Sequence, residues 1–200
     1  MSGESSIAHS RSNSSMDHLT DLLHVDIDSI AAWAGVHVHK IDFRGANARR
    51  ILARACKCPV SDLSEVGIDS ALLQKNVGLV TASHGVPHIF IHRYAVPDRR
   101  WLCGHELGHY LLGHVGQVAP PKGLKYDARE AAADWVAAQL LIPTPLLQQA
   151  VCEHGKDVRS LAALFGVHSR LVSSRLAELG IAEWGTPESE YCTELPMYPW

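Results

Sequence analysis

The chain has 200 residues, of which 46% are hydrophobic and 20% are charged. These ordinary values exclude a wholly disordered chain, a collagen and a coiled coil, and no apolar run is long enough to cross a membrane. The formal net charge of -3 argues against a protein whose main activity is to bind nucleic acid. The unusual number is the count of 13 histidines, which directs attention to metal binding and acid–base chemistry.

The N-terminal segment 1–15 is rich in serine and predicts a disordered polar tail. It has no apolar stretch of the kind that a signal peptide needs. The five cysteines are an odd number, which favours free thiols in a reducing compartment. We therefore expect a cytoplasmic protein that does not act at a membrane.

The first half of the chain predicts a small antiparallel sheet with two helices. Apolar residues at steps of three and four predict a helix over 16–35, and a shorter one is expected over 44–57. Alternating side chains predict a strand at 36–39, and two strands at 78–81 and 88–92 surround a turn.

The second half predicts helices only. A helix over 99–112 is followed by a loop with two prolines at 117–123 and by a helix over 127–142. Shorter helices are expected over 145–154, 159–165 and 169–179. The fold class predicted from these elements is α+β, with the sheet packed on the helix over 99–112 and helical elements at the C-terminal side.

These segments suggest a division of the chain into four parts. The predicted parts are the tail 1–15, a core over 16–143, a helical segment over 144–180 and an extended tail over 181–200.

Residues 105–109 carry the pattern H-E-x-x-H within an apolar helix. Residues four apart lie on one face of a helix, so His105 and His109 can both reach one metal ion. Glu106 lies about 60° from His109 around the helix axis, close enough to act on a water at the metal without binding the metal itself. Two imidazole ligands, a carboxylate base and an open coordination position are what a zinc hydrolase needs.

A catalytic zinc ion usually has three protein ligands, so a third must come from elsewhere. Glu130 is the preferred candidate, because Glu130 and Asp134 share one face of the next helix, where Ala133 and Ala137 allow a close approach. Asp134 would then accept the free N–H of a ligand imidazole, with His105 as its expected partner. His114 is the alternative, but on a continuous helix it points about 180° away from His105.

Other catalytic side chains are weaker candidates. Tyr110 and His88 are candidate transition-state donors, although a structural role suits each of them better. Cys103 is expected to be a packing residue, since a thiol on an apolar helix is seldom a nucleophile. The chain contains no G-x-S-x-G, G-x-x-x-x-G-K-[ST] or G-x-G-x-x-G pattern.

The stretch 160–176 predicts a helix, a turn at Gly166 and a second helix, the pattern of a helix-turn-helix. On the second helix, Arg170, Ser173, Ser174 and Arg175 are the side chains that would face a DNA groove. The alternative is a helical hairpin that packs or docks on a protein partner. The negative net charge favours this alternative over direct DNA binding.

The two motifs together resemble those of the ImmA/IrrE family of metallopeptidases. The resemblance rests on His105-Glu-Leu-Gly-His109 with Tyr110-Leu-Leu-Gly-His114, and on Glu130-x-x-Ala133-Asp134 continued to Pro143. It is strongest over 88–143. The family commonly has Asn where this chain has Asp134 and Phe where it has Val136.

The resemblance implies a compact gluzincin-like core followed by small helical elements. It implies that His105, His109 and Glu130 bind Zn2+ and that Glu106 is the general base. Family members cut a partner transcriptional repressor, typically a helix-turn-helix protein, and thereby derepress mobile-element, phage or stress-response genes. A repressor of this kind is therefore the expected protein substrate.

A second hypothesis keeps the fold but not the reaction. The chain would then be a regulatory module that binds DNA or a repressor through its C-terminal helices without cutting it. The complete set of His105, Glu106, His109 and Glu130 counts against this hypothesis, because a scaffold has no need of a base. A structural zinc domain is less favoured still, because such sites are usually closed by a fourth Cys or His.

Overall fold

The computed structural model describes residues 24–68, 73, 78–95, 99–115 and 128–181. The predicted tails lie outside these residues apart from Ile181, as do the loop at 117–123 and the first part of the predicted helix 16–35. The described chain forms two compact units, Asp26–Leu140 and a second unit that begins at Leu141. The division into four parts stays a prediction.

Three strands form one mixed sheet in the order β1-β3-β2. Strands β2 (Gly78–Ser83) and β3 (Val86–His92) form the expected antiparallel hairpin, whereas β1 (His37–Ile41) runs parallel to β3. The α+β class is therefore confirmed, with one parallel strand pair in place of a wholly antiparallel sheet. Local alternation fixes which residues form a strand but not its direction, which here depends on the long connection after β1.

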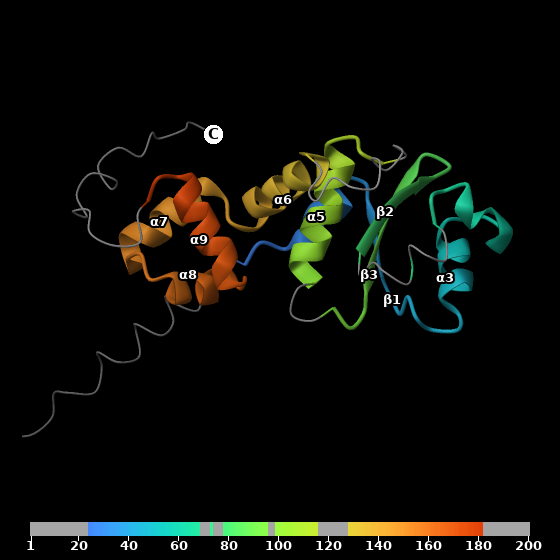
Figure 1. The fold of residues 1–200 in the computed structure, drawn as a ribbon, viewed down its shortest axis with the longest axis horizontal. Coiled ribbons are helices and arrows are strands. Elements are labelled where there is room, and N and C mark those ends of the chain that lie inside the picture. The colour runs from blue at the N-terminus through green and yellow to red at the C-terminus, as the bar shows by residue number, and fades with distance from the viewer. Residues whose placement is uncertain (1–23, 69–72, 74–77, 96–98, 116–127, 182–200) are drawn as a thin grey trace, which may run out of the picture. The chain divides into compact units, whose positions relative to one another are not determined.

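Helices cover both faces of the sheet (Figure 1). Helix α3 (Ala48–Ala55) lies on one face, and α5 (Arg99–Leu111) packs against β2 and β3 on the other. Helix α2 (Ile27–Trp33) packs against α5 and β1. The core under α3 consists of Ile41, Phe43, Leu52, Ala53, Cys56, Leu63, Ile68, Leu73, Leu79 and Phe90.

Two local features differ from the predicted elements. Helix α2 begins only at Ile27, because the Asp26 carboxylate accepts hydrogen bonds from the N–H groups of Asp28 and Ser29 and caps the helix there. A 3-10 helix over Val60–Ser64 was not predicted, since one short turn leaves little periodicity in the sequence.

Helices α5 and α6 (Ala128–Leu141) approach each other closely at small residues. A Cβ atom added at Gly108 would lie 2.7 Å from the backbone oxygen of Ala133. One turn earlier, a Cβ atom added at Gly104 would lie 3.4 Å from the Cβ atom of Ala137, an ordinary contact. The predicted close approach at Ala133 and Ala137 is thus present, and Gly108 is its tightest point.

The second unit contains α7 (Thr144–His154), α8 (Val158–Phe165) and α9 (Ser169–Glu178). Gly166 ends α8 in the left-handed conformation, as the predicted turn requires. Arg175 does not face a groove: its side chain is 1% exposed and bonds to the Ile142 carbonyl, the Thr144 hydroxyl and Glu178. This finding removes Arg175 from the four candidate DNA contacts.

No helix within the described residues is long and apolar enough to span a bilayer. The thiols of Cys56, Cys58 and Cys103 are free, whereas Cys152 is disulfide-bonded, which differs from the expectation of free thiols throughout.

Replacement of the two α5 glycines by alanine should have opposite effects. Gly108→Ala places a methyl group against the backbone of α6, which should lower the free energy of unfolding by about 1–3 kcal/mol and reduce metal content. Gly104→Ala, the matched control, should be neutral or stabilising by up to about 1 kcal/mol, because alanine favours the helix. Denaturant unfolding measures both, and equal destabilisation by the two changes would contradict the close approach.

Candidate metal centre

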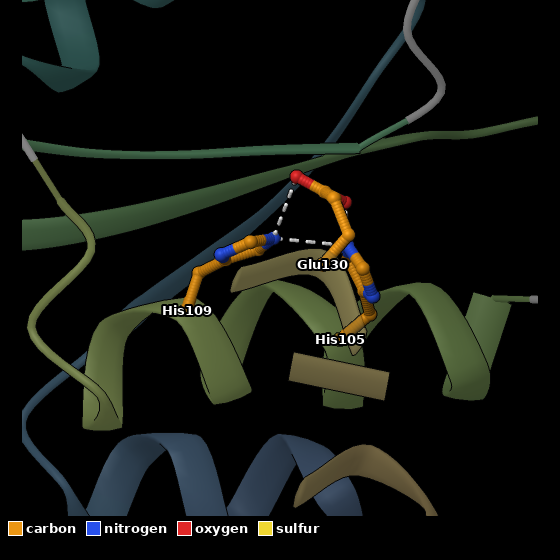
Figure 2. A group of neighbouring side chains, drawn as sticks. All are labelled: His105, His109 and Glu130. Atoms are coloured by element: carbon orange, nitrogen blue, oxygen red, sulfur yellow. Dashed lines mark hydrogen bonds and ion pairs between the residues drawn. The ribbon is translucent and has the colours of Figure 1, made fainter. Parts of the chain in front are cut away.

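Helix α5 presents two imidazoles on one face, as the spacing of the motif predicts (Figure 2). The Nε2 atoms of His105 and His109 are 3.1 Å apart, and the rings meet edge to face with their centroids 4.7 Å apart. Both side chains are largely buried, with 17% and 13% of their surface exposed. The two nitrogen atoms therefore converge on one point beside the helix.

Helix α6 brings Glu130 to the same point, as Figure 2 shows. Its carboxylate oxygens lie 3.3 Å from His105 Nε2 and 3.5 Å from His109 Nε2. Among the described residues these are the only three metal-binding side chains whose ligand atoms all lie within 4.8 Å of one another. Two ligands of a tetrahedral zinc ion, each about 2.0–2.1 Å from it, are separated by about 3.3 Å. The donor set thus fits a zinc ion in both spacing and chemistry.

Asp134 makes the contact expected of it. Its Oδ1 atom lies 2.7 Å from His105 Nδ1, one helical turn beyond Glu130. A neutral imidazole that donates its Nδ1 proton to this carboxylate has an unprotonated Nε2 atom. That atom is directed at His109 and Glu130, where it can bind a metal ion.

His114 makes a contact that the helical pattern did not predict. Helix α5 ends at Leu111, and Gly113 follows with φ 71°. The N–H of His114 then donates to the His109 carbonyl and that of Gly113 to the Tyr110 carbonyl, so that the chain turns back on the helix. The His114 ring returns to His109 with 2.9 Å between the two Nδ1 atoms.

This turn gives His109 a partner on its outer nitrogen, as Asp134 does for His105. The signal in the sequence is Gly113, which ends the helix just before His114 and breaks the angular relation of a continuous helix. Burial lowers the pKa of His109, with smaller contributions from His105 and His114, while the charge of Glu130 opposes them. The neutral imidazole, which is the form that binds metals, is therefore favoured.

Glu106 lies beneath this group, against the edge of the sheet. A Cβ atom added at Gly78 would lie 2.7 Å from Glu106 Oε1, so only glycine leaves room for the carboxyl group on β2. Burial, and to a lesser extent the charge of Glu130, raise the pKa of Glu106 to about 8 against the opposing effect of a hydrogen bond from the Val80 backbone. Glu106 is thus a buried carboxyl group with a perturbed pKa beside the candidate ligands.

The remaining side chains considered from the sequence are Tyr110, His88 and Cys103. Tyr110 follows His109 on α5 and is half-buried. His88 points to the face of the sheet that α3 covers, where it contacts His39, so the structure does not bring it to His105 and His109. Cys103 is buried, and burial raises the pKa of its thiol to about 12, which suits the expected packing role.

Comparison with models of known families matches residues 61–177 to the IrrE N-terminal-like domain, peptidase family M78. No curated protein and no solved structure matches the chain significantly.

The matched segment contains the whole of α5, α6, α7 and α8 and most of α9. Together with the group of His105, His109 and Glu130, it defines the class of the protein as a metallopeptidase. Because the match covers more than half of the chain, the protein belongs to the ImmA/IrrE family.

Removal of the Asp134 carboxylate should weaken metal binding without removing a ligand. Asp134→Ala frees the His105 ring to rotate and should lower the affinity for zinc by about 10–100-fold, the usual cost of losing such a partner. Asp134→Asn keeps an oxygen that accepts the Nδ1 proton and should lose much less. Competition with a zinc chelator measures both, and equal losses would show that the contact does not orient His105.

Proposed function

We propose that the chain is a zinc-dependent endopeptidase of the cytoplasm that hydrolyses a peptide bond in a helix-turn-helix transcriptional repressor. The observation that carries the proposal is the convergence of two imidazoles and a carboxylate, with the buried carboxyl group of Glu106 next to them. Membership of a metallopeptidase family supports the reaction class. The repressor as substrate rests on the resemblance to family members that cut such proteins.

In this proposal His105, His109 and Glu130 hold the zinc ion. When bound, zinc polarises the scissile carbonyl group and makes water a stronger nucleophile near neutral pH. Asp134 and His114 hold the two imidazoles with their Nε2 atoms toward the group. The Glu130 side chain is 49% exposed, so among the described residues the group is open to solvent on that side, where an extended peptide can enter.

Glu106 is the proton carrier of the reaction. It accepts the proton of the attacking water and passes it to the nitrogen of the leaving amine, so the carboxylate is regenerated. With its pKa raised to about 8, Glu106 favours the protonated form at neutral pH when no metal ion is bound, and a cation beside it shifts it toward the charged carboxylate. Burial against Gly78 keeps the group in place for both transfers.

Cleavage of the repressor would remove it from its operators and derepress the genes it controls. Genes of mobile elements, phages or a stress response are the expected targets. The net charge of -3 and the burial of Arg175 make direct DNA binding the less favoured function for the C-terminal helices.

The experiment is co-expression with the helix-turn-helix repressor encoded nearest to this gene. Wild type is compared with Glu106→Gln, and the intact mass of the repressor is measured. Wild type should yield two fragments whose masses add up to that of the repressor plus one water. Glu106→Gln should leave the repressor intact while it retains zinc, because the amide cannot accept the proton. Cleavage by this variant at the wild-type rate would remove Glu106 from its role.

The third ligand is tested by comparing Glu130→Ala with His114→Ala. Loss of the Glu130 carboxylate should lower bound zinc by close to one equivalent relative to wild type, because two imidazoles are too few for a stable site. His114→Ala removes only the partner of His109 and should bind as much zinc as wild type in the absence of a chelator. Metal analysis after dialysis measures both, and the reverse order of zinc loss would assign the third ligand to His114.

The second hypothesis, a regulatory module that binds without cutting, is tested by the same co-expression. A repressor that stays intact with wild type and copurifies with it would favour this module. A DNA affinity that falls steeply with salt concentration would favour direct DNA binding by the C-terminal helices.

A further inference from the structure

Three histidines that the proposed reaction does not use lie together on the sheet. His37 and His39 are two residues apart on β1 and therefore share one of its faces. His88 on β3 is the register partner of His37, which places it on the same face. The three imidazoles come from two neighbouring strands, in an H-x-H pattern completed by one cross-strand histidine.

This face is not the one that carries the candidate metal centre. Phe90 and its register partner Leu79 both belong to the core under α3. His88 is two residues before Phe90 on β3 and therefore lies on the same face of the sheet. Gly78 precedes Leu79 and lies on the opposite face, where a Cβ atom added to it would point at Glu106. The three histidines are thus separated from His105 and His109 by the thickness of the sheet, so the two groups cannot share an ion.

Two of the imidazoles already have the spacing of metal ligands. His39 Nε2 and His88 Nδ1 are 3.1 Å apart, the same separation as between the two Nε2 atoms on α5. It is close to the roughly 3.3 Å expected between two ligands of a tetrahedral zinc ion. Phe90 stacks on His39, with 4.8 Å between ring centroids, and limits the movement of that ring.

His37 is the third member of the cluster and is exposed. Its ring centroid is 5.6 Å from that of His88 and 6.5 Å from that of His39. A metal ion shared by all three requires rotation of the His37 side chain, which costs little at an exposed position. Before such a rotation the ligand atoms of the three histidines do not all lie within 4.8 Å of one another. Among the described residues, only His105, His109 and Glu130 meet that distance.

The protonation state of the cluster suits metal binding. Burial lowers the pKa of His39, and so does His37. Burial also lowers the pKa of His88, followed by His39, His37 and the nearby Lys57. Neutral imidazole is the ligating form. Lys57 is exposed, so its ammonium group can move away when a cation binds.

We propose that His37, His39 and His88 form a second metal site, which takes one divalent transition-metal ion such as Zn2+ through three imidazole nitrogens. Imidazole ligands suit zinc, copper and nickel, and exclude magnesium and calcium as the preferred ions. A fourth position stays open to water or to a side chain of a partner. The site joins β1 to β3, and two of its three ligands precede the segment that matches the family.

The experiment is equilibrium dialysis of the full chain against Zn2+, with metal analysis and circular dichroism of each variant. Wild type should bind two equivalents of zinc, and the double variant His37→Gln/His39→Gln should bind one. Glu130→Ala should lose the other equivalent, and the combination of all three changes should bind none. The buried His88 is left unchanged, because its replacement risks unfolding the sheet.

The matched control is His84→Asn in the turn between β2 and β3. His84 is exposed with φ 50°, a conformation that asparagine tolerates, and its replacement should leave two equivalents bound. A zinc content that stays at the wild-type value in His37→Gln/His39→Gln would overturn the proposal and leave His39 and His88 as a hydrogen-bonded pair. The single variant Glu130→Ala, with His37 and His39 unchanged, tests the site on α5 and α6 independently of the site on the sheet.

Discussion

The contact between α5 and α6 is the constraint on which the candidate metal centre depends. Its two imidazoles come from α5 and its carboxylate from α6, so a change in the distance between the helices separates the ligands. Gly108 lies directly against the backbone of Ala133, one helical turn from Glu130. The distances of 3.3 and 3.5 Å between the Glu130 carboxylate and the two imidazoles follow from that approach. The same approach brings Asp134 to His105, so ligand and orienting partner are set by a single packing contact.

The sheet leaves room for the proposed base, Glu106 of α5, at a second glycine. Gly78 leaves space on β2 for the carboxyl group of Glu106, and the Val80 backbone supplies a hydrogen bond to it. The carboxyl group is buried at a cost in solvation, which appears as a pKa raised to about 8. A structure selected only for stability has little reason to keep such a group. The buried glutamate, the glycine beneath it and the three convergent ligands are together consistent with a hydrolytic site.

Local patterns predicted those parts of the site that depend on position within one helix. The spacing of His105 and His109 and that of Glu130 and Asp134 are properties of the α-helix alone, and small residues at 133 and 137 predicted the approach of α6. The predicted direction of His114, about 180° from His105 around the helix axis, was wrong because it applies only to a helix that continues past Gly113. The parallel direction of β1 and the meeting of His39 with His88 depend on chain connectivity, which alternation of side chains does not contain. The burial of Arg175 depends likewise on Ile142 and Thr144, more than 30 residues earlier in the chain.

The proposed reaction requires one metal ion bound by His105, His109 and Glu130. This binding can be seen in a crystal of the zinc-loaded full chain, with anomalous diffraction recorded on both sides of the zinc absorption edge. We expect a zinc peak about 2.0–2.1 Å from the Nε2 atoms of His105 and His109 and within bonding distance of a Glu130 oxygen. A zinc ion bound by His114 in place of Glu130, or no peak between α5 and α6 in zinc-loaded protein, would contradict it.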